Sequence, residues 1–282
     1  MTQTQSPLIH PTAVIDNTAF VHPTATVGAY CVVGAYCEVG AGTVLHHHSI
    51  LVERTILGAN NVVHSYAMLG NDPQDFKFKG ESTWLRIGDA NTFREYATVH
   101  RATGEGLATE VGNHNYFMAY THVGHNCSVA SHNILANAVQ LAGHIQLGSH
   151  TVIGGAAVFH QGVRIGDYCM ISGFSGVRKS VPHYALIMGS EDGKIAGLNV
   201  VGLRRNGFDA ETRTLIKRAY KTLFYAKGLL SERLNDVKAS REYQHPSIQK
   251  LVEFVEQCGN RGVCGVTRST KISTVTENEK ET

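Results

Sequence analysis

The sequence predicts a mainly β protein, in which a left-handed parallel β-helix of hexapeptide repeats is followed by a C-terminal α-helical domain. Three observations support this prediction. An apolar residue recurs at every sixth position over most of the first 182 residues, glycine often follows it, and helical periodicity begins only after that segment. So short a repeat is typical of a solenoid, whose coils each bury one face on their neighbours.

The repeat keeps one frame from Ile9 onward. We call the apolar residue the first position of its hexad. It is occupied without a polar exception by Ile15, Val21, Val27, Val33, Val39, Leu45, Leu51, Leu57, Val63 and Leu69, then Ile87, Phe93 and Val99, then Val111, Phe117, Val123, Val129, Leu135, Leu141, Leu147, Ile153, Phe159, Ile165, Ile171 and Val177. Three hexads make one triangular coil of 18 residues, so residues 18 apart stack in columns at the usual strand spacing of about 4.8 Å.

Each hexad position has a physical role. The first position points inward, a glycine at the second permits the tight corner, and a small residue at the fifth fits the narrow interior. Cys31, Cys37, Cys127 and Cys169 all fall on the fifth position, so we expect small core residues there and not redox or metal groups. About ten coils between residues 9 and 182 would form a rod of roughly 45 to 50 Å.

Two insertions interrupt the frame, and functional groups are often added at such sites. The first loop runs from Gly70 to Trp84, and the second, "ATGEGLATE", begins at Ala102. After residue 182 a connector leads to two helical patterns, one capped by Asp209 and ending at Gly228, the other running from Ser247 to Gly259. The chain thus divides into a β-helix (1–182), a connector with a helical domain (183–264) and a polar tail (265–282) that we expect to be disordered.

Composition narrows the class of protein. The net charge of +2 is nearly balanced, which argues against a nucleic-acid binder. The N-terminus has no basic segment followed by an apolar one, and no apolar run is long enough to cross a membrane. The six cysteines contain no C-x-x-C pair. We therefore expect a cytoplasmic protein without membrane insertion.

Histidines converge on one edge of the predicted rod. Adding 18 to His125 gives Gly143, and adding 18 again gives Gln161, while His144 and His160 lie beside this column and His122 is one corner away. Such convergence is typical of an active site. His114, His132 and His150 form another column, at the outward fourth position, where a solvated surface is the simpler interpretation. A zinc site shared between chains and a non-catalytic solenoid remain alternatives.

Specific motifs add a family resemblance. They are "IHPTAV", "NDPQDFKFKGE", "ATVHRAT", "THVGHNCSV", "ILANAVQLAGH", "GGAAVFHQ" and "GLRRNGF", and they cover nearly the whole chain up to the polar tail. In these motifs the sequence resembles the UDP-N-acetylglucosamine O-acyltransferase family. The resemblance implies the first step of lipid A biosynthesis, and hence of lipopolysaccharide assembly. In that step an (R)-3-hydroxyacyl chain passes from acyl carrier protein to the glucosamine 3-hydroxyl of UDP-N-acetylglucosamine, in a homotrimer with active sites between subunits.

The resemblance also implies roles for individual residues. His125 would be the general base, a role that suits a neutral imidazole facing a weakly nucleophilic hydroxyl, and the Gly143 N–H would stabilise the thioester oxyanion. It implies no metal and no cofactor of the protein's own, because the phosphopantetheine arrives on the acyl carrier protein. Residues expected to bind substrate are Asp75, Lys77, His122, His144, His160, Gln161, Asn199, Arg204 and Arg205, and those expected to measure the acyl chain are Gly155, Met170 and Gly173.

Three positions depart from the family pattern. Asn126 stands where relatives commonly have an aspartate after the base, Val201 replaces a carboxylate and Asn206 replaces an arginine. An amide can accept a hydrogen bond from an imidazole but cannot neutralise an imidazolium. A related reaction that forms an amide on a 3-amino UDP-sugar also fits the same base and donor, and stays an alternative.

Overall fold

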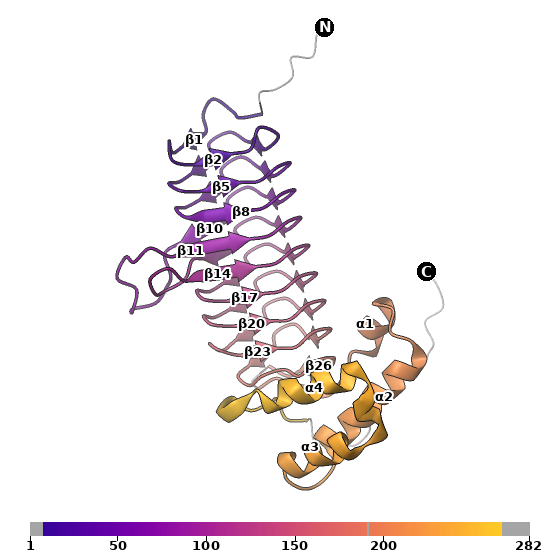
Figure 1. Ribbon diagram of the computed structural model, residues 1–282. Coiled ribbons are helices and arrows are strands. Elements are labelled where there is room, and N and C mark those ends of the chain that lie inside the picture. Colours follow the sequence, from indigo (N-terminus) through magenta and orange to yellow (C-terminus); the bar gives the residue numbers. More distant parts are fainter. Residues whose placement is uncertain (1–7, 191, 267–282) are drawn as a thin grey trace.

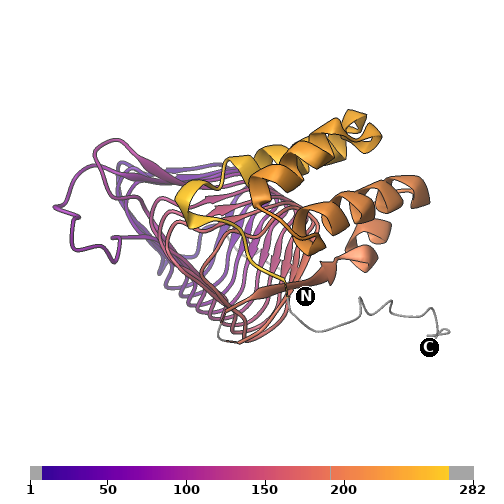
Figure 2. The ribbon, with the colours of Figure 1, turned by 90° about the horizontal axis from the view of Figure 1, so that it is seen from below.

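In the computed structural model, which describes residues 8–190 and 192–266, the chain winds into a left-handed parallel β-helix with a triangular outline (Figures 1 and 2). The predicted fold class is confirmed. Short strands from successive coils pair in parallel and form one sheet on each side of the prism. The helices gather at the C-terminal end of the rod, and the first loop projects from its side (Figure 1).

Each sheet takes one strand from nearly every coil. In the described residues, the nine-stranded sheet contains β1 (Val14–Ile15), β4 (Val32–Val33), β7 (Ile50–Leu51), β10 (Met68–Asn71), β13 (Thr98–His100), β16 (His122–Val123), β19 (Gln140–Leu141), β22 (Val158–Phe159) and β25 (Gly176–Val177). The eight-stranded sheet contains β2 (Phe20–Val21), β5 (Glu38–Val39), β8 (Thr55–Leu57), β11 (Trp84–Ile87), β14 (Ala108–Val111), β17 (Ser128–Val129), β20 (Gln146–Leu147) and β23 (Arg164–Ile165). The ten-stranded sheet contains β3 (Thr26–Val27), β6 (Val44–Leu45), β9 (Val62–Val63), β12 (Thr92–Phe93), β15 (Tyr116–Phe117), β18 (Ile134–Leu135), β21 (Val152–Ile153), β24 (Met170–Ile171), β26 (Ala185–Met188) and β27 (Lys194–Leu198).

The strand register explains why the frame survives both insertions. In regular coils, partners are 18 apart, as in Val14 opposite Val32. Across the first loop Met68 pairs with Thr98, a separation of 98 − 68 = 30, and across the second Thr98 pairs with His122, a separation of 122 − 98 = 24. Both separations are whole multiples of six. Each insertion therefore bulges outward while the inward positions stay in phase.

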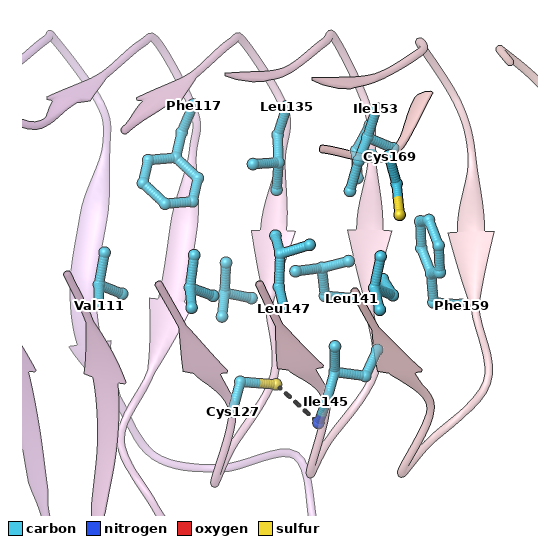
Figure 3. Packing of buried hydrophobic residues seen from close by; sticks show 14 of the residues in the cluster. Val111, Phe117, Cys127, Leu135, Leu141, Ile145, Leu147, Ile153, Phe159 and Cys169 are labelled. Atoms are coloured by element: carbon cyan, nitrogen blue, oxygen red, sulfur yellow. Dashed lines mark hydrogen bonds between the residues drawn. The ribbon is translucent and has the colours of Figure 1, made fainter. Parts of the chain in front are cut away.

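The interior is filled as the repeat predicts. The four cysteines at the fifth position are at most 1% exposed, and burial raises the pKa of Cys127 and of Cys169 to about 12, as expected for core thiols. Figure 3 shows the packed columns, where the Ile145 N–H donates to Cys127 Sγ at 3.4 Å. A buried ladder of asparagines also occupies the fifth position and bonds to backbone and to itself: Asn61, Asn91, Asn115 and Asn133.

The corner geometry corrects one sequence-based expectation. A positive φ falls mainly on the fourth hexad residue, such as Tyr66 (64°) or His132 (63°), and not on the second-position glycines. Those glycines are needed for a different reason. A Cβ on Gly28 would lie 2.7 Å from His47 N of the next coil, so glycine allows adjacent coils to approach closely.

The C-terminal segment adds more structure than the sequence suggested. The predicted connector contains β26, the antiparallel strand β27 and the short helix α1 (Val200–Arg205). Asp209 caps α2 (Ala210–Tyr220) as expected, and its carboxylate accepts the Thr212 N–H at 2.6 Å. The remaining elements are η1 (Lys221–Tyr225), α3 (Leu230–Ala239), η2 (Arg241–Gln244), α4 (Pro246–Glu256) and η3 (Gly259–Arg261).

The two predicted helices differ from the observed ones at their ends. The helix expected to run to Gly228 changes to a π-helical turn at Lys221 and ends at Tyr225. The helix expected to start at Ser247 starts at Pro246, with His245 as its cap. Lys250 on α4 pairs with Asp167 on the rod, which fastens the helices to the β-helix. The expected disorder of the tail lies outside the described residues from position 267 onward. No helix in the described ranges is long and apolar enough to span a membrane.

Candidate active site

The predicted histidine column lies at the corner between the nine-stranded and the eight-stranded sheets, which we call the catalytic edge. His122 belongs to β16, and the chain then turns through His125 before entering β17. The next coil brings Gly143 to the same corner, and the His144 N–H donates to His125 O at 2.8 Å across the two coils. The hexad frame thus places residues distant in sequence side by side.

A cavity of about 300 Å³ opens at this edge. Both polar and apolar side chains line it. Its lining consists of Gln74, His100, His122, Gly124, His125, Gln140, Leu141, Ala142, Gly143, Val158, Phe159 and Gln161. A concave site with convergent polar groups is the form that small-molecule and catalytic sites take.

His125 is more buried than its outward hexad position suggests, with 6% of its surface exposed. The ring of His144 meets it edge to face, with centroids 5.1 Å apart. Asp75, on the first loop, lies on another side of the ring, with Oδ2 3.9 Å from Nδ1. The loop and the neighbouring coil therefore enclose the imidazole, which the repeat alone would leave at the surface.

Hydrogen bonds around Asn126 fix the tautomer of His125. The Asn126 amide pairs twice with the backbone of Thr103 on the second loop: Oδ1 accepts the Thr103 N–H at 3.0 Å, and Nδ2 donates to Thr103 O at 3.0 Å. The amide therefore cannot flip, and its oxygen faces His125 Nδ1 at 2.8 Å. Since a carbonyl oxygen only accepts, Nδ1 carries the proton. In the neutral ring, Nε2 then holds the free lone pair.

Gly143 packs against the Nε2 side of this ring. A Cβ built on Gly143 would lie 2.5 Å from His125 Nε2, so only glycine leaves the ring its place. Gly143 is buried, and within the described part of the chain its N–H meets no hydrogen-bond acceptor. A buried N–H without a partner is rare in folded proteins. Here it is a donor available to a ligand in the cavity.

The histidines around His125 are held neutral. Burial lowers the pKa of His100 to about 4, and it also lowers the pKa of His122 and of His144. Their proximity to His125 acts in the same direction, because two positive imidazoliums repel each other. The Thr98 hydroxyl lies 2.9 Å from His122 Nδ1 and orients that ring.

Comparison with known proteins places this site in a family. A family model described as UDP-N-acetylglucosamine O-acyltransferase, domain 2, matches residues 181–264. An acyl-[acyl-carrier-protein]–UDP-N-acetylglucosamine O-acyltransferase of Thermodesulfovibrio yellowstonii is 43% identical over 79% of this chain and 86% of its own, and one of Syntrophobacter fumaroxidans is 37% identical over 90% and 98%. The crystal structure of UDP-N-acetylglucosamine O-acyltransferase from Moraxella catarrhalis superposes with a TM-score of 0.86, at 39% identity, over 90% of this chain and 98% of that one.

The chain belongs to the UDP-N-acetylglucosamine O-acyltransferase family. It is therefore an acyltransferase. The family model matches the part of the chain that contains the helices, while the relatives match both that part and the β-helix.

Some predicted site residues lie together and others do not. The cavity at the catalytic edge is lined by His122, His125, Gly143 and Gln161, and Asp75 lies beside His125. The remaining members of this group lie close by: His144 against His125, His160 next to Gln161 at the same edge, and Lys77 in the loop with its N–H donating to Asp75 at 3.0 Å.

The residues expected to bind the nucleotide and to measure the acyl chain lie on other parts of the same subunit. Asn199 caps α1, and its Nδ2 donates to Tyr168 O, at the corner between the eight- and ten-stranded sheets, with Arg204 and Arg205 exposed on the same helix. Met170 belongs to β24 of the ten-stranded sheet, and Gly155 and Gly173 occupy the corner between that sheet and the nine-stranded one.

Several lining residues were not predicted as site residues. His100 ends β13, and Gln74 comes from the first loop. Gln140, one coil beyond His122 in the strand register, was detectable from the 18-residue spacing. Arg101 pairs with Asp72 of the first loop, and Thr103 of the second loop pairs with Asn126; the repeat contains no signal for either contact. The described residues contain no group of three potential metal ligands.

Proposed function

We propose that this acyltransferase transfers an (R)-3-hydroxyacyl chain from acyl carrier protein to the 3-hydroxyl of UDP-N-acetylglucosamine, which is the first step of lipid A biosynthesis. The names of the relatives support the two substrates. One observation carries the proposal for the chemistry: His125, whose Nε2 holds a free lone pair, and Gly143, whose N–H is unpartnered in the described residues, line the same cavity.

The reaction follows from these two groups. Nε2 of His125 accepts the proton of the sugar 3-hydroxyl as its oxygen attacks the thioester carbonyl. The carbonyl oxygen becomes negative in the tetrahedral intermediate and accepts the Gly143 N–H. When the intermediate collapses, the carbon–sulfur bond breaks, and the imidazolium returns its proton to the leaving thiolate. The products are the sugar ester and free pantetheine thiol.

This chemistry needs no resident metal or cofactor, and none is part of the proposal. The phosphopantetheine belongs to the acyl carrier protein and leaves with it. The base and the oxyanion donor both come from this chain, and the neutral histidines around them supply hydrogen bonds to substrate without competing for the proton.

A homotrimer with active sites between subunits completes the proposal. Within one chain, α1 and the residues expected to measure the acyl chain lie away from the catalytic edge, on the ten-stranded sheet or at its two corners. A neighbouring rod packed beside it would bring its own α1 and its own Gly173 to the cavity. Asn199, Arg204 and Arg205 would then hold the nucleotide, and Met170, Gly155 and Gly173 would bound the acyl groove.

The acyl carrier protein is proposed to dock on the exposed arginine and lysine side chains of the helical segment. Arg204 and Arg205 on α1 and Lys217, Arg218 and Lys221 on or next to α2 are all exposed. Acidic partners are attracted to such patches. A cytoplasmic location belongs to the same proposal, because all six cysteines are free and buried, as is typical of reducing compartments.

The decisive experiment supplies UDP-N-acetylglucosamine, or its 3-amino analogue, with acyl carrier protein thioesters of different chain lengths and identifies the products by mass. We expect a 3-O-acyl product and preference for the hydroxyl sugar. Faster acylation of the amino sugar would replace the proposed reaction by amide formation, and the absence of product with every donor would overturn it.

A further inference from the structure

His125 lacks a charged neighbour at the position that follows it. Asn126 supplies a neutral oxygen to Nδ1, and its double pairing with Thr103 keeps that oxygen in place. When the ring takes up a proton in the reaction proposed above, the amide can accept a hydrogen bond but cannot offset the positive charge. The negative charge that stabilises the imidazolium therefore has to come from another residue of the site.

The charged and titratable groups facing His125 are few. On the rod they are His100, His122 and His144, whose neutral forms are favoured. On the first loop they are Asp75 and Lys77, both close enough to influence the neighbouring His144. Within the described residues, Asp75 is the only carboxylate whose oxygen comes within 4.0 Å of a ring nitrogen of His125.

Asp75 is kept ionised and in place by the loop itself. The Lys77 N–H donates to Asp75 Oδ1 at 3.0 Å, and this hydrogen bond holds the pKa of the carboxyl below its ordinary value. The side chain of Asp75 is only 17% exposed, so water screens it less than it screens a surface carboxylate.

A buried arginine holds the first loop on the rod. Arg101, 6% exposed in its side chain, pairs with Asp72 of the loop at 2.6 Å and with Glu53 of an earlier coil at 3.0 Å. Its guanidinium also lies over the ring of Phe78, 5.5 Å from the centroid. One cation thus ties the loop on both sides of Asp75 to the corner that carries His125.

We propose that the first loop carries the counter-charge of the catalytic histidine: Asp75 stabilises the His125 imidazolium, and Arg101 positions Asp75 by anchoring the loop. An adjacent carboxylate could both set the tautomer of His125 and offset its positive charge. In this chain Asn126 sets the tautomer and Asp75 supplies the charge. The proposal rests on the role of His125 in the proposed function, and Asp75 can still accept a hydrogen bond from the sugar, because each carboxylate oxygen accepts more than one.

The first test needs no substrate. In protein labelled at histidine Cε1, the His125 resonance, identified by its loss in His125→Gln, is titrated in the wild type and in variants. A nearby carboxylate favours the protonated ring, so Asp75→Asn should move the midpoint to lower pH. Glu110→Gln, which removes the same charge from an exposed strand, should leave it unchanged.

Charge relocation gives the sharper result. In Asp75→Asn/Asn126→Asp the carboxylate stands at the position of the amide oxygen that lies 2.8 Å from Nδ1, and the midpoint should return to the wild-type value or above. Arg101→Met should shift the midpoint in the same direction as Asp75→Asn. If Arg101→Met does not fold, the milder Asp72→Asn tests the same anchor and should shift the midpoint in the same direction. A midpoint unchanged in Asp75→Asn contradicts the proposal, and one unchanged in both loop-anchor variants contradicts the role of Arg101.

Kinetics then separates charge from sugar binding. Asp75→Asn should lower kcat by about 10- to 100-fold and move the acid limb of kcat/KM to lower pH, in parallel with the titration, and the double variant should recover part of kcat. An increase in the KM for the sugar nucleotide alone, with kcat and the pH profile unchanged, would assign Asp75 to binding only and overturn the proposal. Because the titration is independent of turnover, a failure of the proposed function would leave the titration result standing.

Discussion

Gly143→Ala offers a direct test of how closely the catalytic edge is built. The added Cβ would lie 2.5 Å from His125 Nε2, 2.6 Å from Cε1 and 2.9 Å from Cδ2. Ordinary contact begins near 3.4 Å, so the ring has to move by about 3.4 − 2.5 = 0.9 Å. The backbone N–H of residue 143 is retained, so the variant changes the position of the base and leaves the proposed oxyanion donor in place.

The ring cannot move this far without losing contacts. Nδ1 is bonded to an amide that Thr103 holds rigidly, and the ring of His144 packs against the imidazole. A misplacement of about 1 Å in a reacting group can cost about 100-fold in rate. We therefore expect kcat to fall by about 100-fold, with little change in thermal stability, because Gly143 is not among the described residues with positive φ.

The assay is steady-state acyl transfer with UDP-N-acetylglucosamine and an acyl carrier protein thioester, combined with thermal unfolding. Gly197→Ala is the matched control, because a Cβ on Gly197 meets no atom within 4 Å. Wild-type kcat in Gly143→Ala would show that residue 143 does not border the reacting nitrogen. A kcat that falls equally in the control would point to a general effect of the substitution.

Four further outcomes follow from the same structure. Replacing His125 by Ala should reduce turnover by about 100- to 10,000-fold while circular dichroism stays native, and near-normal turnover would exclude it as the base. Gly173→Met should shift the preferred donor from about C12–C14 toward C10 in a thioester panel, since each buried methylene contributes about 0.8 kcal/mol, and an unchanged profile would exclude the groove. The KM for acyl carrier protein should rise with salt, and substituting Lys217 and Arg218 by Gln should flatten that dependence. A salt-independent KM in the wild type would argue for another docking surface. Burial lowers the pKa of His183 to about 4; Asp167 opposes this shift, and Lys250 and Arg164 add to it. The free energy of unfolding should therefore decrease as pH falls from about 6.5 toward 4. In thermal unfolding measured against pH, His183→Gln should remove part of that dependence.

The elements that local spacing controls were predictable from the sequence. Inward residues such as Val123 and Leu141 follow from a period of six, and the column of His125, Gly143 and Gln161 follows from a coil of 18, because equal coils stack with a fixed rise. The cap at Asp209 was likewise predictable, since it depends only on the next three residues.

Elements that depend on partners far along the chain were not predictable in the same way. The hairpin of β26 and β27 exists because β26 continues the ten-stranded sheet, and α3 has too weak an apolar stripe to be recognised before it packs on its neighbours. The corners adopt positive φ at residues such as Tyr66, whose ring stacks on that of Tyr96, 5.3 Å away, in the next coil.

For this protein the sequence by itself determined the β-helix, its register and the residues that share the catalytic edge, because a repeated short-range pattern fixes which side chains point inward and which lie one coil apart. Only the tertiary structure decided what surrounds His125. Loops have no period, so their positions depend on contacts such as the ion pair of Arg101 with Asp72 and the pairing of Asn126 with Thr103. Those contacts bring Asp75 to 3.9 Å from the base, and no spacing in the sequence encodes that approach.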